Sequence, residues 1–255
     1  MSLERGKLNP VAVALLSADA ICYINRHGTK IEGDSLPKHG PFIVTGNHFN
    51  EYDARKGHYF GLMSHRMIRI IVKQSLLKKG AVESDDYLIS LNETKEGAIK
   101  EYSPIKSWVL NRIGTIGILR DHPGLGFRRE IQSDIKQGHG VGIFLQDHRQ
   151  KDCLLENLQP GVAYFARVNP DVAIYTLASA GPPVDEVDRA TLLKLGTYNE
   201  LKAGYGKDLT ISELTLIIAD LIATSLPEKP LVDWATRWSF ELDRLNNLTK
   251  KSSKK

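Results

Sequence analysis

The sequence has few cysteines and no long apolar run, and both shortages narrow the classes of protein that it can be. Its two cysteines, Cys22 and Cys153, stand alone, without a C-x-x-C pair or a regular spacing. They offer no disulfide framework and suit a reducing compartment. The first uncharged run, residues 8–18, is far shorter than the ~20 apolar residues that cross a bilayer, and it lacks a basic start and a small-residue cleavage site. We therefore expect neither a membrane-spanning helix nor a signal peptide.

The composition is that of an ordinary globular chain. Of its 255 residues, 42% are hydrophobic and 25% are charged, and no internal repeat or low-complexity linker divides them. A chain of this length can bury most of the surface that its unfolded state exposes without needing disulfides or metal ions for stability. We expect an N-terminal apolar helix within residues 1–27, a single α/β domain over 28–249, and a basic tail over 250–255.

Two features favour contact with a membrane surface. Residues 9–24 are apolar almost all round, which is typical of a helix that either packs inside the protein or lies in the interface of a bilayer. The formal net charge is +4, and the tail over 250–255 contains four lysines, each attracted to anionic lipid by about 1 kcal/mol near the surface. We expect a cytoplasmic protein that associates peripherally with the inner or cytoplasmic face of a membrane, and no nucleic-acid partner.

Continuous apolar runs predict buried strands. They lie at residues 42–46, 67–73, 115–119, 140–145 and 172–180. Helical patterns fall between them, at residues 51–64, 105–112, 126–137 and 161–168. Strands without polar alternation are buried on both faces, and strand–helix alternation indicates a parallel sheet. The predicted fold class is therefore α/β, with a mostly parallel sheet covered by helices on both faces.

The last third of the chain, from about residue 186, is predicted to be helical. The segment 211–230, ISELTLIIADLIATSLPEKP, opens with a serine followed by an acid and ends at Pro227. The next segment repeats apolar residues at helical spacing, with Trp234, Trp238 and Leu242 on one stripe. Such a stripe indicates a helix face packed against the core.

The strand at 42–46 runs into a histidine that is followed five residues later by an acid, in the stretch IVTGNHFNEYD. Asn50 and Asp53 have the spacing of a helix N-cap and its third residue, so one interpretation is plain capping. Capping does not account for His48, which stands at a strand end, where open α/β sheets gather their ligand sites. A histidine with a nearby carboxylate has the parts of a general base and the group that orients it. The residues alone leave both interpretations open.

Several segments, in order, resemble the motifs of the glycerolipid acyltransferase superfamily, the lysophospholipid or 1-acylglycerol-3-phosphate type. Its first motif, Asn-His-x4-Asp, is matched by His48 and Asp53, and the preceding family pattern is matched by GDSLPKHGP at residues 33–41. The second motif resembles GTIGILRD, which supplies Arg120. The fourth resembles LQPGVAYFARVNPDVAIYTLASAGPP, residues 158–183.

The third motif is degenerate. The family pattern is Phe-Pro-Glu-Gly-Thr-Arg, and the sequence FLQDHR keeps only Phe144 and Arg149. The resemblance implies that this stretch helps to hold the acceptor's glycerol phosphate, so the expected substrate-binding residues are Arg120, Gln146, Asp147 and Arg149. Gln146 has nearly the shape of the family's glutamate, and the resemblance predicts that Gln146→Glu preserves or raises activity.

The resemblance implies an O-acyltransferase that moves a fatty acyl group from an acyl thioester, either acyl-CoA or acyl carrier protein, to a hydroxyl of a lysophospholipid or related acceptor. His48 would be the general base and Asp53 its orienting partner. No bound cofactor is implied. The adjacent Asp-His pairs at 121–122 and 147–148 predict no metal site, because neighbours on a strand point to opposite faces. A lipid-binding relative without catalysis, and a hydrolase using the same pair, are the alternatives.

One acidic segment, residues 80–103, has no counterpart of this length in much of the family that the chain resembles. It is either a surface excursion or a lid or docking face. The sequence leaves both interpretations open.

Overall fold

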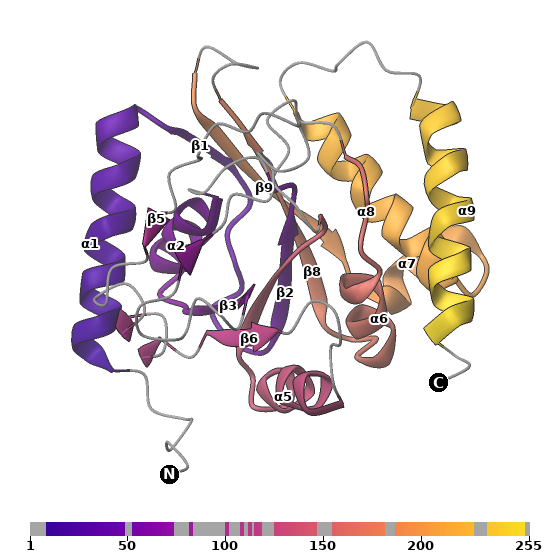
Figure 1. Cartoon of the computed structure of the whole chain (residues 1–255), viewed down its shortest axis with the longest axis horizontal. Coiled ribbons are helices and arrows are strands. Elements are labelled where there is room, and N and C mark those ends of the chain that lie inside the picture. Colours follow the sequence, from indigo (N-terminus) through magenta and orange to yellow (C-terminus); the bar gives the residue numbers. More distant parts are fainter. Residues whose placement is uncertain are drawn as a thin grey trace.

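The fold is built on one seven-stranded sheet of order β1-β9-β8-β2-β7-β3-β6 (Figure 1). The computed structural model describes residues 9–48, 53–73, 82–83, 100–101, 108–109, 112–113, 115–118, 125–146, 155–181, 187–226 and 234–252. The strands are β1 (Lys30–Gly33), β2 (Phe42–Gly46), β3 (Ile68–Lys73), β6 (Ile116–Ile118), β7 (Gly140–Phe144), β8 (Ala173–Ala180) and β9 (Arg189–Gly196). Every neighbouring pair is parallel except β8 and β9, so the sheet is mostly parallel.

The five predicted strands are confirmed as β2, β3, β6, β7 and β8. In β2, which lies at the centre of the sheet, every residue is buried. Its neighbours β7 and β8 run parallel to it, with Phe144 and Leu177 both in register with Gly46. Burial on both faces explains the unbroken apolar run. The register brings the carboxyl ends of three strands to one edge of the sheet.

The helical prediction beyond residue 186 is wrong for Arg189–Gly196, which is the strand β9, antiparallel to β8. This segment buries Ala190 and Leu192 and leaves the residues on either side of each partly exposed, so burial alternates with the period of a strand. The strand β1 is not predicted either. Among the described residues it is an edge strand paired with β9. Most of its residues are exposed, so no apolar run marks it in the sequence.

Helices cover both faces of the sheet, which confirms the predicted class. On one face lie α2 (Asp53–Met63) and, outside it, α1 (Pro10–His27). On the other lie α5 (Leu125–Lys136), α6 (Gly161–Val168) and α8 (Ile211–Ser225), with α9 (Trp234–Ser252) packed on α8. The short helix α7 (Tyr198–Tyr205) connects β9 to α8. Of the predicted helix at 105–112, too little lies within the described residues to compare.

The two C-terminal helices follow the predicted patterns with one difference. The N-cap of α8 is Thr210, which forms a capping box with Glu213, while the expected Ser212 is buried inside the helix. In α9, Trp238 packs against the core as predicted. The helix continues to Ser252, past the boundary expected at residue 249.

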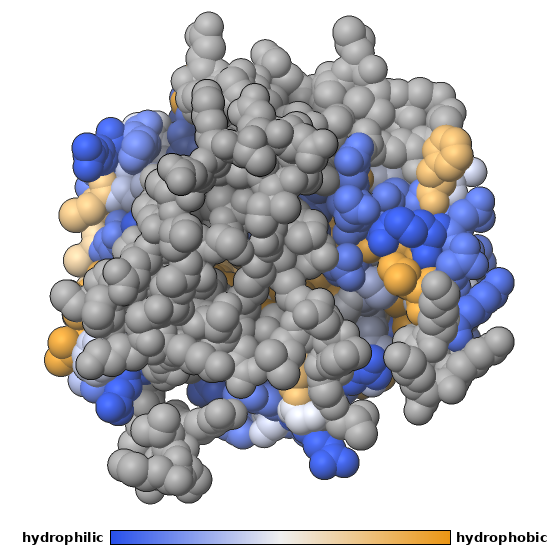
Figure 2. Space-filling view, viewed as in Figure 1, coloured by the Kyte–Doolittle hydropathy of each residue, from blue (hydrophilic) through white to orange (hydrophobic). Residues whose placement is uncertain are grey.

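The helix α1 has one packed face and one exposed apolar face. Arg55 of α2 holds it through Asp19, with 2.6 Å between Nε and Oδ2, and lies over the ring of Tyr23. The exposed residues on α1 include Val11, Leu15 and Ile21. Figure 2 shows apolar surface along the edge of the molecule where α1 lies. Among the described residues, no helix combines the length and apolar character needed to cross a membrane.

The acidic segment 80–103 contributes two short antiparallel strands, β4 (Val82–Glu83) and β5 (Lys100–Glu101). The rest of that segment lies outside the described residues. Its interpretation as an excursion, a lid or a docking face therefore stays open.

Candidate active site

Polar side chains gather at the carboxyl ends of β2, β7 and β8. Asn47 and His48 follow β2, Gln146 follows β7, and Ser179 lies near the end of β8. These strands are neighbours and parallel, so their ends meet at one edge of the sheet. This edge is where ligands bind in open α/β sheets.

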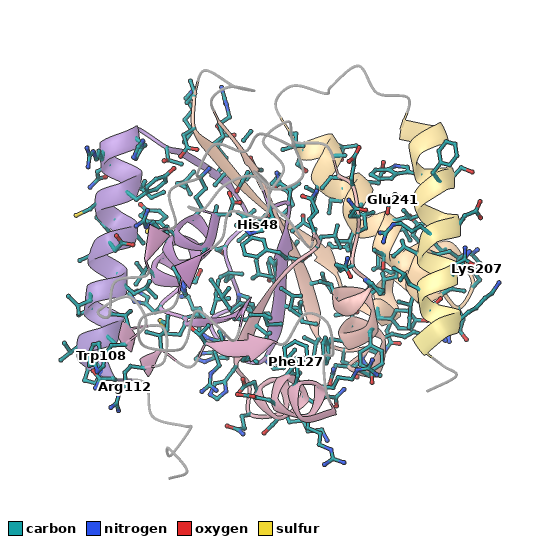
Figure 3. The ribbon with its side chains drawn as sticks, viewed as in Figure 1. His48, Trp108, Arg112, Phe127, Lys207 and Glu241 are labelled. Carbon is teal, nitrogen blue, oxygen red and sulfur yellow. The ribbon has the colours of Figure 1, made fainter. Side chains whose placement is uncertain are left out.

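His48, labelled in Figure 3, faces Asp53, the first residue of α2. The distance from His48 Nδ1 to Asp53 Oδ2 is 3.3 Å. The Asp53 side chain is fully buried, whereas that of His48 is 18% exposed. A proton on Nδ1 that points at the carboxylate leaves Nε2 as the acceptor nitrogen of the ring. The arrangement is that of a general base held in one tautomer by a buried acid.

Phe144 fixes the plane of the His48 ring. The two rings stack with 4.3 Å between their centroids and 13° between their planes. Phe144 is the last residue of β7 and lies opposite Gly46, so the sheet register itself sets the stacking. The sequence shows Phe144 only as a retained motif residue, because the stacking depends on which strands are neighbours.

Asn47 ties the exit of β2 to β8. Its Nδ2 donates to the backbone carbonyl of Ser179 at 2.7 Å, and its Oδ1 accepts from the backbone N–H of Ser179 at 2.8 Å. Both hydrogen bonds are buried, and the two together fix the amide in one orientation. Asn47 therefore holds the backbone immediately before His48.

Gln146 ties the same exit to β7 from the other side. Its Oε1 accepts from the backbone N–H of His48 at 2.9 Å, and its Nε2 donates to the carbonyl of Glu156 at 3.4 Å. The residue is 4% exposed. Gln146 thus lies beside His48, and these hydrogen bonds go to the protein's own backbone; its role in substrate binding stays a prediction. The other expected substrate-binding residues, Arg120, Asp147 and Arg149, lie outside the described residues, as does Asn50.

These contacts alter what is expected of Gln146→Glu. A carboxylate oxygen would face the Glu156 carbonyl oxygen, and a charge would be buried where an amide donor now sits. We expect the variant to lose about 1–3 kcal/mol of unfolding free energy, the usual cost of a buried polar group without its partner. Denaturant unfolding measures this loss. The matched control is Gln159→Glu, because Gln159 makes a similar bond to the carbonyl of Asn157 at the surface. Undiminished stability together with raised activity would instead support the family-type role of position 146.

A buried ion pair anchors α2 beneath the site. Lys56, one turn after Asp53, is fully buried, and its Nζ lies 2.6 Å from Oδ1 of Asp188 and 3.2 Å from the carbonyl of Arg189. The other Asp188 oxygen accepts from Thr29 at 2.6 Å and from Tyr23 at 3.2 Å. This network could not be predicted from the sequence. Its only local sign is a lysine on the helix face that also carries the buried Phe60.

A second histidine near the site, His58 on α2, belongs to the core. His58 is 5% exposed, and burial lowers its pKa to about 4, with Asp19 acting in the opposite direction. It therefore stays neutral at physiological pH. Within the part of the chain that the structure describes, no group of three or more His, Cys, Asp or Glu side chains is placed to hold a metal ion.

The fold has a known counterpart. The structure is similar to the crystal structure of the 1-acyl-sn-glycerophosphate (LPA) acyltransferase PlsC from Thermotoga maritima, with a TM-score of 0.55 and 14% sequence identity. The similarity covers 82% of this chain and 76% of that one. No protein-family model and no curated protein sequence matches the chain. At this identity the likeness establishes a shared fold, and it agrees with the resemblance found in the sequence motifs.

Proposed function

We propose that the protein transfers a fatty acyl group from an acyl thioester to a hydroxyl of a lysophospholipid or related acceptor. The observation that carries the proposal is the His48–Asp53 pair, 3.3 Å apart at the carboxyl end of the central strand. The acyltransferase fold of the structural counterpart supports it. The donor class, acyl-CoA or acyl carrier protein, comes from the sequence resemblance.

In this mechanism His48 Nε2 takes the proton of the acceptor hydroxyl as its oxygen attacks the thioester carbonyl carbon. The carbon–sulfur bond then breaks, and the imidazolium returns the proton to the leaving thiolate. The products are an ester and a thiol. An alcohol is a poor nucleophile at neutral pH, whereas a thioester is already activated, so the base is the main requirement. Asp53 stabilises the imidazolium that forms, as the acid of a serine-protease triad does.

The exposed apolar face of α1 fits association with a membrane, where a lysophospholipid acceptor resides. Val11, Leu15 and Ile21 are 59%, 46% and 44% exposed. An apolar helix face and the lysines of residues 250–255 are two weak signals that together give reversible binding. We propose peripheral binding through this face.

The double variant Val11→Ser/Leu15→Ser is expected to reduce binding to anionic vesicles. Removing two apolar side chains weakens the hydrophobic contribution to membrane binding. High salt weakens the attraction between the lysines and anionic lipid. Sedimentation with vesicles at low and high salt measures both. Met63→Ser is the matched control, since Met63 is 67% exposed on α2. If the wild-type protein stays out of the pellet at both salt concentrations, the proposed surface is wrong.

The test of the proposed function is an assay of the purified protein with acyl-CoA, acyl-loaded carrier protein and a panel of lysophospholipids, read by mass spectrometry. An acylated lipid product that depends on His48 supports acyl transfer. Free fatty acid without an acylated product would indicate a hydrolase, and lipid binding without turnover would indicate a non-catalytic relative.

A further inference from the structure

The C-terminal helix reaches back to the candidate active site through two charged residues one turn apart. Glu241 accepts hydrogen bonds from two consecutive backbone N–H groups. Its Oε1 lies 3.2 Å from the backbone nitrogen of Asn157, and its Oε2 lies 3.3 Å from the backbone nitrogen of Leu158. Arg244 Nη2 donates to the carbonyl of Leu158 and lies 2.6 Å from Glu241 Oε2. Figure 3 shows Glu241 on the side of α9 that faces the sheet. The pair therefore binds the backbone of residues 157–158.

The bound segment is itself paired with the end of β7. Leu158 is fully buried and forms an antiparallel bridge with Gln146, and the N–H of Gln159 donates to the carbonyl of Leu145 at 2.7 Å. Asn157, between the helix contact and the bridge, has a φ of 52°, in the left-handed region. Asparagine adopts this conformation more readily than most residues other than glycine, and the contacts on both sides hold it there.

Gln146 carries the connection into the site. Its Oε1 accepts from the backbone N–H of His48, and its Nε2 donates to the carbonyl of Glu156, next to the segment that α9 binds. The connection from Glu241 to His48 thus runs through hydrogen bonds to residues 156–159 and through the backbone that joins those residues. Each step involves a backbone group, so a shift of the segment moves the backbone of His48.

Resting on the proposed function, we propose that Glu241 and Arg244 are positioning residues for His48. They hold the backbone of residues 157–158. The carbonyl of the adjacent Glu156 accepts from Gln146 Nε2, and Gln146 Oε1 accepts from the backbone N–H of His48. A general base works only when its nitrogen is correctly placed, and a misplacement of about 1 Å lowers a rate as much as 10²-fold. Glu241 is 12% exposed and Arg244 31% exposed, so the pair is largely shielded from solvent.

The test compares Glu241→Gln and Arg244→Met with Asp243→Asn, a control at an exposed position on the same helix. We expect kcat to fall on the order of tenfold in the first two, with KM for the thioester unchanged. Arg244→Lys should recover only part of the loss, because an ammonium lacks the planar fork that bonds Leu158 and Glu241 together. Assays are run well below the melting temperature of each variant, so that a lower kcat does not reflect unfolded protein. Asp243→Asn should match the wild-type protein.

A second readout is independent of turnover. In protein labelled at histidine, the ring resonances of His48, assigned with His48→Gln, should shift in Glu241→Gln and Arg244→Met but not in Asp243→Asn. If the wild-type protein shows no acyl transfer, the proposed function fails and this shift still tests the coupling. A lower melting temperature with unchanged kcat and unchanged His48 resonances would show that the pair only fastens α9, which would overturn the proposal.

Discussion

His48→Ala is expected to lower turnover about 10²–10⁴-fold, the usual contribution of a general base. Its ring nitrogen Nδ1 faces Asp53 at 3.3 Å, so Nε2 is the group that takes the acceptor's proton. The ring also stacks on Phe144, and its removal takes a partner from the buried Asp53. We therefore expect a stability loss of about 1–3 kcal/mol, larger than that of a surface substitution.

His48→Gln separates the loss of turnover from the loss of stability. Its side-chain amide retains a donor for Asp53 but cannot act as a base, so turnover should fall as far as in His48→Ala while less stability is lost. Asp53→Asn should also be impaired, because a neutral amide does not stabilise the imidazolium. Steady-state kinetics and melting curves of the three variants give the comparison.

His58→Gln is the control with the opposite expectation. His58 lies on the same helix as Asp53 but is buried in the core, so its replacement should lower stability and leave the chemistry at His48 intact. Near-normal turnover in His48→Ala would show that the stretch from His48 to Asp53 serves only to begin α2. The capping interpretation would then be correct, and the proposed mechanism wrong.

The central strands could be predicted because burial on both faces leaves unbroken apolar runs. The same reasoning failed at β9, whose alternating residues are buried on one side only, and at β1, which is exposed at the edge of the sheet. Strands that are buried on both faces could be recognised in the sequence, and strands that are exposed on one face or at an edge could not. The two strands of the seven-stranded sheet that were missed are the neighbours β1 and β9, at one edge of that sheet.

The candidate site also has a part that could be predicted from the sequence and a part that could not. His48 and Asp53 lie five residues apart, so their proximity follows from one strand–helix turn. The contacts of Asn47 with Ser179 and of Gln146 with His48 join residues 132 and 98 positions apart. They depend on β2 lying between β7 and β8, which a single sequence does not reveal. The proximity of His48 and Asp53 was therefore predictable, and the contacts that support it from neighbouring strands were not.

Lys56→Met is expected to produce the largest loss of stability, about 3–5 kcal/mol of unfolding free energy, the usual result of removing one partner of a buried ion pair. Lys56 is fully buried, and its loss leaves the Asp188 carboxylate inside the protein without its cation. For a chain of this size, each kcal/mol shifts the melting temperature by roughly 2–4 °C. Calorimetry or a melting curve measures the shift.

The double variant Lys56→Met/Asp188→Asn distinguishes an unpaired charge from lost packing. An asparagine at 188 keeps an oxygen for Thr29 but carries no charge, so the double variant should be more stable than Lys56→Met. The control is Lys202→Met, which breaks the exposed pair with Asp208 and should shift the melting temperature far less. Because α2 carries Asp53 one turn before Lys56, turnover should follow the same order, lowest in Lys56→Met and partly restored in the double variant. If the double variant is no more stable than Lys56→Met, the loss comes from packing around the lysine stem, and the buried charge is not what fastens α2 to the sheet.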